Sequence, residues 1–280
     1  MVSVIIPTLN AEKEIENLIY KLQSQSVQPN EIIVVDSESE DYTIALCKKH
    51  NIQVIEIKRN DFDHGRTRDM ALSATHGDIV LFLTQDAVPA DRYLIENLKK
   101  VFADNDVAIA YGRQLPKENA TPQERLVRNF NYPPKSHIRT KKDLQQYGIK
   151  TYFTSDVCCA YRRSVYLALG GFEYPLKTSE DMFMAVKVIN AGYKIVYAAD
   201  ACVYHSHNLT LKQQYERNKI IAYELSRHKH IMNGVKPYGE GLRLVKYVMW
   251  NLLKQGRLDC MVMFFFDCCA RILGNRMGRV

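Results

Sequence analysis

Short apolar runs alternate with segments of helical periodicity along the first 110 residues. The runs are rich in β-branched residues and apolar nearly throughout, which is typical of parallel strands buried on both faces of a sheet. They cover residues 2–6, 31–35, 52–57, 78–83 and 107–111. Two sets of side chains between these runs have the spacing of amphipathic helices: Ile15, Leu18, Ile19 and Leu22, and Leu94, Leu98, Val101 and Phe102.

This alternation predicts the α/β class, with right-handed crossovers and a doubly wound, mostly parallel sheet. Such sheets bind ligands at the carboxyl ends of their strands, near the point where the strand order reverses. The residues that directly follow each strand are therefore the first candidates for chemistry.

The alternation stops at residues 116–150, where four prolines and a basic run at 135–142 predict an insertion with some helix at 121–130. The basic run is typical of a solvated loop, although it is also suited to contact an anionic acceptor. Strand and helix signals return over 151–192, and residues 194–205 predict another strand. A helical pattern then continues from 209 onward. We expect a catalytic domain over 1–241 and a basic amphipathic helical tail over 242–280.

Composition narrows the class of protein. Apolar residues make up 46% of the 280 residues and charged residues 25%, as in ordinary soluble domains. The tail carries seven Lys or Arg and two acidic residues, so it holds +5 of the total net charge of +7. Seven cysteines without a CxxC pair predict free thiols and a reducing compartment. Neither a signal peptide nor an apolar stretch of about 18 residues is evident, so we expect a cytoplasmic protein.

Polar residues follow three of the predicted strands. After the first, Pro7 is expected to stop the strand, and the segment 7–10 opens a helix whose N–H groups suit a phosphate or base, unless it is a plain turn. Asp36 begins an acidic cluster at 36–41, which suits a base or a ribose, or else caps a helix at 42–50. Asp86 suits a divalent cation that bridges a diphosphate, or else is satisfied by nearby backbone.

Asp181 and His205 each have two interpretations. Thr178 and Asp181 have the spacing of a capping box, which predicts a stable helix start. A carboxylate at that helix terminus is expected to stay ionised, as a general base requires, although the helix dipole lowers its basicity. His205 follows a strand and could ligate a metal as neutral imidazole, with His207 pointing the same way, although a single His is more often structural.

Two common nucleotide motifs are missing from the sequence. No GxGxxG follows the first strand, which disfavours a dinucleotide oxidoreductase. No GxxxxGK[ST] is present, which disfavours a P-loop NTPase. Nucleic-acid binding is also disfavoured, because the chain has no zinc finger and no aromatic RNP pattern.

The motifs occur in one order along the chain. They are PTLN at 7–10, the acidic cluster at 36–41, HGRTRD at 64–69, TQDA at 84–87, ED at 180–181 and YH at 204–205. This order resembles that of the family 2 inverting glycosyltransferases, which have a single nucleotide-sugar-binding domain of the A-type glycosyltransferase fold. FDHGRTRD followed by LFLTQDAVP is most similar to the bacterial rhamnosyltransferase branch, whose donor is dTDP-L-rhamnose. The resemblance covers about residues 2–215.

The resemblance implies a role for each matching residue. The nucleotide sugar would be held by Pro7, Thr8, Asn10, Asp36, Arg68, Gln85 and Asp86, with Arg68 near the diphosphate. Asp86 and His205 would hold Mg²⁺ or Mn²⁺, and Asp181 would be the general base. Glu180, Gln214 and Arg217 would lie at the acceptor.

Two positions depart from the family pattern. Thr84 replaces the first Asp of D-x-D, which leaves one carboxylate for the metal. Asp69 stands where the family usually has Asn, so it would bring negative charge near a diphosphate unless it pairs with Arg68 or Arg66.

The sequence leaves alternatives for the location of the tail and for the identity of the donor. Apolar stripes beside positive charge predict a segment that lies on an anionic membrane leaflet, which would make the acceptor a lipid-linked saccharide at the inner face of the plasma membrane. The alternative is a helical pair packed on the body or in a homodimer. For the reaction, the alternatives are a UDP-linked donor of galactose, glucose or N-acetylglucosamine, or a protein that binds a nucleotide sugar without turnover.

Overall fold

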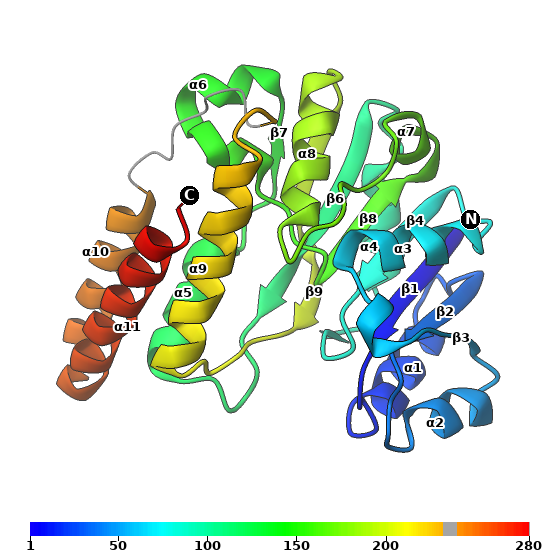
Figure 1. The fold of residues 1–280 in the computed structure, drawn as a ribbon, viewed down its shortest axis with the longest axis horizontal. Coiled ribbons are helices and arrows are strands. Elements are labelled where there is room, and N and C mark those ends of the chain that lie inside the picture. Colours follow the sequence, from blue (N-terminus) through cyan, green and yellow to red (C-terminus); the bar gives the residue numbers. More distant parts are fainter. Residues whose placement is uncertain (232–239, 280) are drawn as a thin grey trace.

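The computed structural model describes residues 1–231 and 240–279. Across these residues nine strands form one sheet, with helices on both faces (Figure 1). The strands are β1 Val2–Thr8, β2 Glu31–Asp36, β3 Gln53–Glu56, β4 Ile79–Leu83, β5 Val88–Pro89, β6 Val107–Leu115, β7 His137–Arg139, β8 Cys158–Arg162 and β9 Lys194–Tyr204. The helices are α1 Ile15–Gln23, α2 Thr43–Lys49, α3 His64–Ser73, α4 Leu94–Val101, α5 Pro122–Asn131, α6 Leu144–Tyr147, α7 Arg163–Ala168, α8 Glu180–Asn190, α9 Leu211–Arg227, α10 Glu240–Lys254 and α11 Leu258–Met277.

The sheet has the strand order β3-β2-β1-β4-β8-β6-β9-β5, and β7 pairs with β9. β1 is parallel to both β2 and β4, β2 is parallel to β3, and β6 is parallel to β9. The predicted α/β class and crossover sheet are confirmed. The apolar pattern did not reveal that β8 lies antiparallel between β4 and β6. The strand order reverses between β1 and β4, so a ligand is expected where these two strands end.

Each face of the sheet has its own hydrophobic cluster. Val4 and Ile6 of β1 belong to the cluster with α1 and α4, whereas Ile5 belongs to the cluster with α3, α7 and α8. The four apolar residues of the predicted stripe on α1 are all fully buried. Burying one such side chain contributes about 1.5–3 kcal/mol. The apolar period of the sequence therefore determines which helix face meets the sheet.

Two local predictions are wrong. β1 does not stop at Pro7 but runs on to Thr8. Pro7 lies beyond the last residue of β1 that pairs with β4, so its missing N–H breaks no bond of that ladder. The basic run at 135–142 is not simply a loop, because His137–Arg139 form an edge strand against β9.

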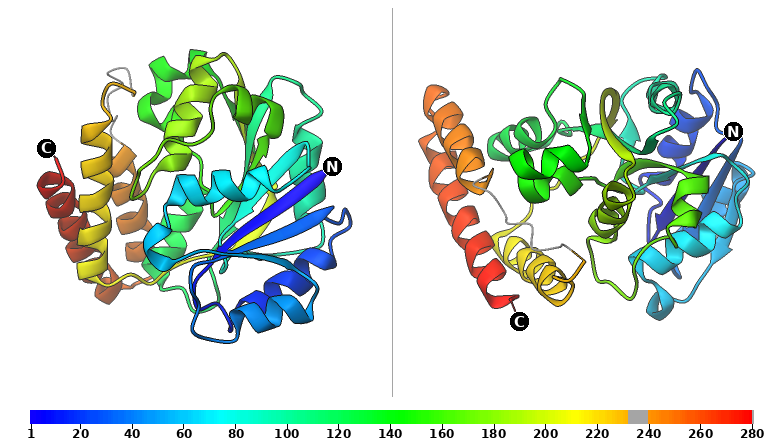
Figure 2. Two further views of the ribbon diagram at one scale, coloured as in Figure 1. Left: turned by 45° about the vertical axis from the view of Figure 1, so that its right-hand side comes forward. Right: turned by 90° about the horizontal axis from the view of Figure 1, so that it is seen from above.

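The tail helices pack on the body of the protein. Leu126 and Val127 of α5 form a third hydrophobic cluster with residues of α10 and α11. Figure 2 shows α11 beside α9 in both views. A Cβ on Gly274 or Gly278 would collide with a backbone carbonyl oxygen of α9, so these glycines permit the close contact. Packing on the body was one of the arrangements that the sequence predicts.

The outer surface of the tail is apolar. None of the helices in the part of the chain that the structure describes is long and apolar enough to cross a membrane. Several large hydrophobic side chains of the tail are nevertheless exposed: Leu242, Trp250, Leu253, Leu258, Val262, Met263, Phe265, Phe266, Ile272, Leu273 and Met277.

Candidate active site

A cavity of about 180 Å³ lies where β1 and β4 end. Three residues that the sequence assigns to the nucleotide line it together: Pro7, Thr8 and Gln85. The Gln85 amide ties the two strand ends, because its Oε1 accepts the Leu9 N–H at 2.9 Å and its Nε2 donates to the Leu9 carbonyl at 3.2 Å. The strand-order reversal thus creates the cavity, and one side chain holds its two sides in register.

Asp36 lies beneath this cavity. Its buried carboxylate accepts the Thr8 hydroxyl at 2.9 Å and both the N–H and the hydroxyl of Ser39, at 2.8 and 2.6 Å. It therefore closes the turn at 36–39 and does not cap α2, where Asp41 instead accepts the N–H of Thr43, the first helical residue, at 3.0 Å. The structure gives Asp36 a supporting place behind Thr8.

Asn10 joins the first and second strand ends outside the cavity. Its backbone has φ 50°, a left-handed conformation that Asn tolerates. Its N–H donates to the Ser39 hydroxyl at 2.8 Å, and its side-chain oxygen accepts the Glu40 N–H at 2.9 Å. Asn10 is exposed and holds the 36–41 segment beside the 7–10 segment.

A second cluster consists of Asp86, His205 and His207. Nε2 of His205 lies 3.5 Å from Asp86 Oδ2, and Nε2 of His207 lies 3.4 Å from the same oxygen. One ligand atom from each residue lies within 4.8 Å of the others, which suits a single metal ion. Lys117 Nζ also contacts Asp86 Oδ2, at 3.2 Å. The structure thus brings the two predicted ligands together and adds His207.

The donor set fits a divalent cation. Burial lowers the pKa of His205 to about 3, so its imidazole is neutral, as ligation requires. The Gln114 Oε1 accepts hydrogen bonds from His205 Nδ1, at 3.0 Å, and from Arg128. The proton of His205 is therefore on Nδ1, and the lone pair of Nε2 is available to a metal ion. Burial opposes ionisation of Asp86, but the Lys117 cation at 3.2 Å helps to hold the pKa of its carboxyl below the usual value. These residues therefore present one carboxylate oxygen and two neutral nitrogens.

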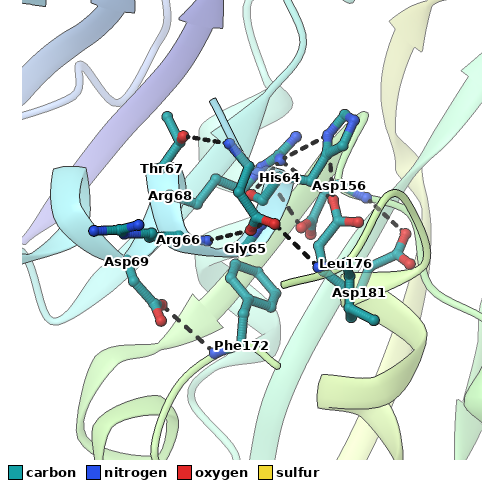
Figure 3. Close-up of polar contacts among 12 residues, drawn as sticks. His64, Gly65, Arg66, Thr67, Arg68, Asp69, Asp156, Phe172, Leu176 and Asp181 are labelled. Atoms are coloured by element: carbon teal, nitrogen blue, oxygen red, sulfur yellow. Dashed lines mark hydrogen bonds and ion pairs between the residues drawn. The ribbon is translucent and has the colours of Figure 1, made fainter. Parts of the chain in front are cut away.

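Arg68, which the resemblance places near the diphosphate, is buried against two carboxylates in the structure. Its guanidinium is 3% exposed and is packed between two carboxylates: its Nε is 3.7 Å from Asp156 Oδ2 and its Nη1 is 3.2 Å from Glu180 Oε1 (Figure 3). Nη1 also donates to the His64 carbonyl at 2.8 Å. Arg68 therefore contacts the start of α8, and Glu180, which the sequence assigns to the acceptor, is buried against it.

Asp181 is the carboxylate at the start of α8. The Asp156 N–H donates to its Oδ2 at 3.3 Å, and the Met182 N–H donates to its Oδ1 at 2.7 Å. The predicted capping box is wrong: the N-cap is Ser179, whose backbone is left-handed at φ 71° and whose side chain makes no cap bond.

The electrostatics of Asp181 also differ from the prediction. Burial raises the pKa of the Asp181 carboxyl well above its ordinary value, and the neighbouring Glu180 and Asp156 raise it further. Burial likewise raises the pKa of Asp156 to about 7, although Arg68 opposes this. Loss of solvent and like charge outweigh the helix dipole here, so Asp181 is a stronger base than an ordinary aspartate.

Asp69 points away from this cluster. Its Oδ1 accepts the Tyr166 hydroxyl. The same oxygen lies 3.5 Å from the Phe172 N–H (Figure 3). It pairs with neither Arg68 nor Arg66, and instead anchors the turn at 170–172. The Asp69 carboxyl therefore lies beside Tyr166 and Phe172, and it points away from Arg68 and Asp181.

The two residues of α9 assigned to the acceptor lie near each other but differ in exposure. Gln214 is buried and lines a cavity that also contacts His207. Arg217, one turn further along α9, is exposed. Neither makes a described contact with Asp181.

Hydrogen bonds connect the His205 cluster to Asp181. Gln114, which holds His205, also donates from Nε2 to the Ser155 hydroxyl at 3.0 Å. Ser155 precedes Asp156, whose N–H binds Asp181. The proposed metal ligands and the carboxylate at the start of α8 therefore belong to one connected region of the protein.

Sequence reasoning missed several residues of this region. Asp156 directly precedes an apolar run, as Asp78 does, and that position could have marked it as a residue at a strand end. The two-residue spacing predicts that His207 points the same way as His205, but it does not identify His207 as a ligand. Arg59 and Phe62 also line the cavity of Thr8; Phe62 begins the FDHGRTRD motif without a role assigned to it, and no local pattern marks Arg59.

Comparisons with known proteins agree with this geometry. Residues 3–170 match the model of "Glycosyl transferase family 2". The chain is 38% identical to the O-antigen chain rhamnosyltransferase RfbN of Salmonella typhimurium and 39% identical to WbaN, an O-antigen chain rhamnosyltransferase of Salmonella anatum. Each match covers 99% of this chain and 89% of the relative.

Solved structures share the fold at lower identity. The mannosyltransferase PcManGT from Pyrobaculum calidifontis, in complex with GDP-Man and Mn²⁺, superposes with a TM-score of 0.68 at 18% identity, over 99% of this chain and 86% of that one. S. aureus TarS 1–349 in complex with UDP-GlcNAc superposes with a TM-score of 0.59 at 19% identity, over 99% and 92% of the two chains.

Proposed function

The chain belongs to glycosyl transferase family 2, and we propose that it transfers L-rhamnose from dTDP-L-rhamnose to a hydroxyl of a lipid-linked saccharide, with inversion, in the synthesis of a bacterial surface polysaccharide. The observation that carries the choice of sugar is the likeness to two O-antigen chain rhamnosyltransferases over nearly the whole chain. The geometry supports the reaction class, because a cavity, a cluster of metal-ligand type and a basic carboxylate lie along one edge of the sheet.

In this proposal the nucleoside occupies the cavity lined by Thr8 and Gln85. Phe62 offers an apolar face to the base, and Arg59 offers a cation beside the same cavity. Asp36 and Asn10 do not line this cavity. They support it indirectly, because their hydrogen bonds hold the segments 7–10 and 36–41 in place. Arg68 acts through Glu180 and Asp156 and positions the start of α8.

The chemistry begins at Asp181. Its carboxylate removes the proton of the acceptor hydroxyl, and the hydroxyl oxygen attacks the anomeric carbon from the face opposite the diphosphate. The bond from that carbon to the diphosphate oxygen breaks, and its electron pair leaves with dTDP. A single in-line displacement inverts the anomeric centre, and Asp181 carries the proton away.

Asp86, His205 and His207 would hold the cofactor, which we propose to be Mn²⁺ rather than Mg²⁺. Two imidazole nitrogens suit Mn²⁺ better, because Mg²⁺ prefers oxygen ligands. When bound, the cation neutralises the charge that develops on the leaving diphosphate. With Thr84 in place of a second Asp, the donor's phosphate oxygens are needed to complete the coordination, so we expect metal and nucleotide to bind together.

Calorimetric titration with dTDP, UDP, GDP and ADP, each with and without Mn²⁺, tests the donor without knowledge of the acceptor. We expect Mn²⁺-dependent preference for dTDP. Preference for UDP would keep the reaction class and replace rhamnose by a sugar carried on UDP, such as galactose, glucose or N-acetylglucosamine. Absence of binding to all four would contradict the proposal.

Replacement of Asp181 by Asn tests the base. Asn cannot accept the proton, so we expect transfer to fall by at least about 100-fold, since general-base catalysis typically contributes 10²–10⁴-fold. Binding of dTDP-L-rhamnose should stay within twofold of wild type. If donor binding is lost as well, Asp181 belongs to the donor site and is not the base.

The tail provides a membrane-binding surface in this proposal. Phe265 and Phe266 are exposed on α11 beside the basic residues of a segment with a net charge of +5. Apolar side chains next to positive charge suit the headgroup region of an anionic leaflet. We infer that residues 1–241 catalyse the reaction, while residues 242–280 hold the enzyme peripherally on the cytoplasmic face, where the acceptor lipid is embedded.

A further inference from the structure

Two cavities adjoin along α9. The first, of about 510 Å³, lies between Phe62, His64, Lys177 and the C-terminal half of α9. The second, of about 460 Å³, lies between α9 and the end of α11, and is lined by Lys219 and Met277 among others. Both are lined by Lys177 and Tyr223, so they form one continuous depression, which we call the α9 groove.

The α9 groove holds three cationic side chains that have no ion-pair partner in the part of the chain that the structure describes. Lys177 and Arg227 line the first cavity and Lys219 the second, and none of the three forms an ion pair within the described residues. All three instead lie over tyrosine rings of α9, at 5.5–5.9 Å from the ring centroids. The rings hold the cations in place but leave their charges uncompensated.

Three carboxylates also line the groove, Asp63, Glu216 and Glu224, so the formal charges of its acidic and basic residues cancel. Asp63 is already used at the start of α3, where it accepts the Gly65 and Arg66 N–H groups, and it also accepts the Leu176 N–H. Glu224 is buried and accepts the Lys177 N–H at 3.2 Å. Glu216 lines the second cavity and is exposed. None of these carboxylates forms an ion pair with Lys177, Lys219 or Arg227, so the three cations remain able to contact a bound anion.

One end of the groove reaches the catalytic region. His64 lines it, and His64 Nδ1 lies 3.8 Å from Glu180 Oε1, next to the proposed base Asp181. Phe62 lines both the groove and the proposed nucleoside cavity. A ligand in the groove would thus lie close to the donor without occupying its cavity.

The other end reaches the apolar surface of the tail. Met277 lines the second cavity and is 65% exposed, and Leu273, one turn before it on α11, is 55% exposed. In Figure 1 the end of α11 lies beside α9, on the same side of the molecule as the exposed tail helices. The groove therefore runs from His64, which lies beside Glu180 at the start of α8, past three cations, to an apolar surface.

We propose that the α9 groove binds the phosphate or diphosphate of the lipid-linked acceptor. Its saccharide would point toward Asp181, its phosphate oxygens would lie on Lys177, Lys219 and Arg227, and its lipid chain would leave past Met277. The order of saccharide, phosphate and lipid in such a molecule matches the order of surfaces along the groove. This inference rests on the proposed function for the identity of the acceptor.

The test uses short probes and the full chain. Farnesyl diphosphate, inorganic pyrophosphate and farnesol are titrated into protein saturated with dTDP, so that the nucleotide cavity is already filled. The variants are Lys219→Gln and Arg227→Gln. Lys212→Gln is the matched control, because Lys212 is an exposed cation on the same helix outside the groove.

We expect farnesyl diphosphate to bind more tightly than either other probe, because only it offers both charge and an apolar chain. Each of the two variants should raise its Kd about tenfold or more, as expected for loss of a charge-assisted hydrogen bond. Lys212→Gln should leave the Kd within twofold of wild type.

Three results would overturn the proposal. Equal binding of farnesyl diphosphate to wild type and to both variants would exclude the groove. Pyrophosphate binding as tightly as farnesyl diphosphate would exclude a lipid path, and farnesol binding as tightly would exclude a phosphate site. The titrations are repeated without dTDP, so a failure of dTDP binding, which would count against the proposed function, is distinguishable from a failure of the groove.

Discussion

The chemical properties of the candidate site residues depend on the groups around them as much as on the residue type. His205 is a suitable metal ligand because Gln114 fixes its Nδ1 and burial keeps its ring neutral. Asp181 is a suitable base because two further carboxylates and the loss of solvent raise its pKa. In both cases the side chain is visible in the sequence, while its chemistry depends on groups far away along the chain.

Replacement of His207 by Asn tests the role that we propose for it as a third metal ligand. His207 Nε2 lies 3.4 Å from Asp86 Oδ2, so its loss should weaken Mn²⁺ binding to the dTDP-loaded protein by at least about tenfold. Mn²⁺ electron paramagnetic resonance measures the free ion directly. His230→Asn is the control, because His230 is an exposed histidine remote from Asp86 in sequence. An unchanged affinity in His207→Asn would leave only Asp86 and His205 as ligands.

The pH dependence of transfer tests the raised pKa of Asp181. A base with a raised pKa becomes protonated at higher pH, so kcat should fall on acidification at a pH well above the value of about 4 for an ordinary aspartate. Asp156→Asn removes a negative neighbour, which lowers the pKa of Asp181 and should move this acid limb to lower pH. An acid limb that stays in place in Asp156→Asn would show that another group controls it.

At the scale of helices and strands, local patterns succeed where burial follows the period of the element. The stripe on α1 is buried as its spacing predicts. The capping box at α8 fails because Ser179 takes a left-handed conformation and starts the helix one residue later than Thr178 would. The tight contact of α9 and α11 depends on two glycines whose role only the packing reveals.

Replacing a helical glycine by alanine should change the free energy of unfolding in opposite directions at Gly241 of α10 and at Gly274 of α11, because only Gly274 packs closely against α9. Alanine is a better helix former than glycine by about 1 kcal/mol. At Gly241 no atom of the residues that the structure describes lies within 4 Å of the added Cβ, so Gly241→Ala should be neutral or stabilising. At Gly274 it would collide with the Tyr215 carbonyl, so Gly274→Ala should destabilise the protein by about 1–3 kcal/mol. Urea unfolding of both variants measures this, and equal effects would contradict the close contact.

At the scale of the whole molecule, three hydrophobic clusters stabilise different parts of the described structure. Two of them lie on the faces of the sheet and build the catalytic body, and the third joins α5 to the tail helices. The tail therefore lies against the body on one side and exposes an apolar surface on the other.

Membrane binding by this surface is tested with a double substitution. Phe265 and Phe266 are 59% and 49% exposed, so replacing both by Ser should not disturb the core. Each phenylalanine contributes about 1.5–3 kcal/mol when buried, so binding to anionic vesicles should weaken by at least about tenfold in sedimentation assays. Leu167→Ser, at an exposed apolar position of α7, is the control. Unchanged sedimentation, with a shift from dimer to monomer in light scattering, would instead assign the surface to a homodimer.

The sequence by itself determined the α/β class, the alternation of strands and helices over about the first 110 residues, and the family resemblance, because apolar periodicity and strand-end motifs are local properties. It also identified Asp86, His205 and Asp181 as candidates. Only the tertiary structure decided that His207 joins the first two, that Arg68 is buried against Glu180, that Asp69 faces away, and that burial and like charge raise the pKa of Asp181. Contacts between residues far apart in the chain, and the loss of water around them, decide these features, and neither has a local signature in the sequence.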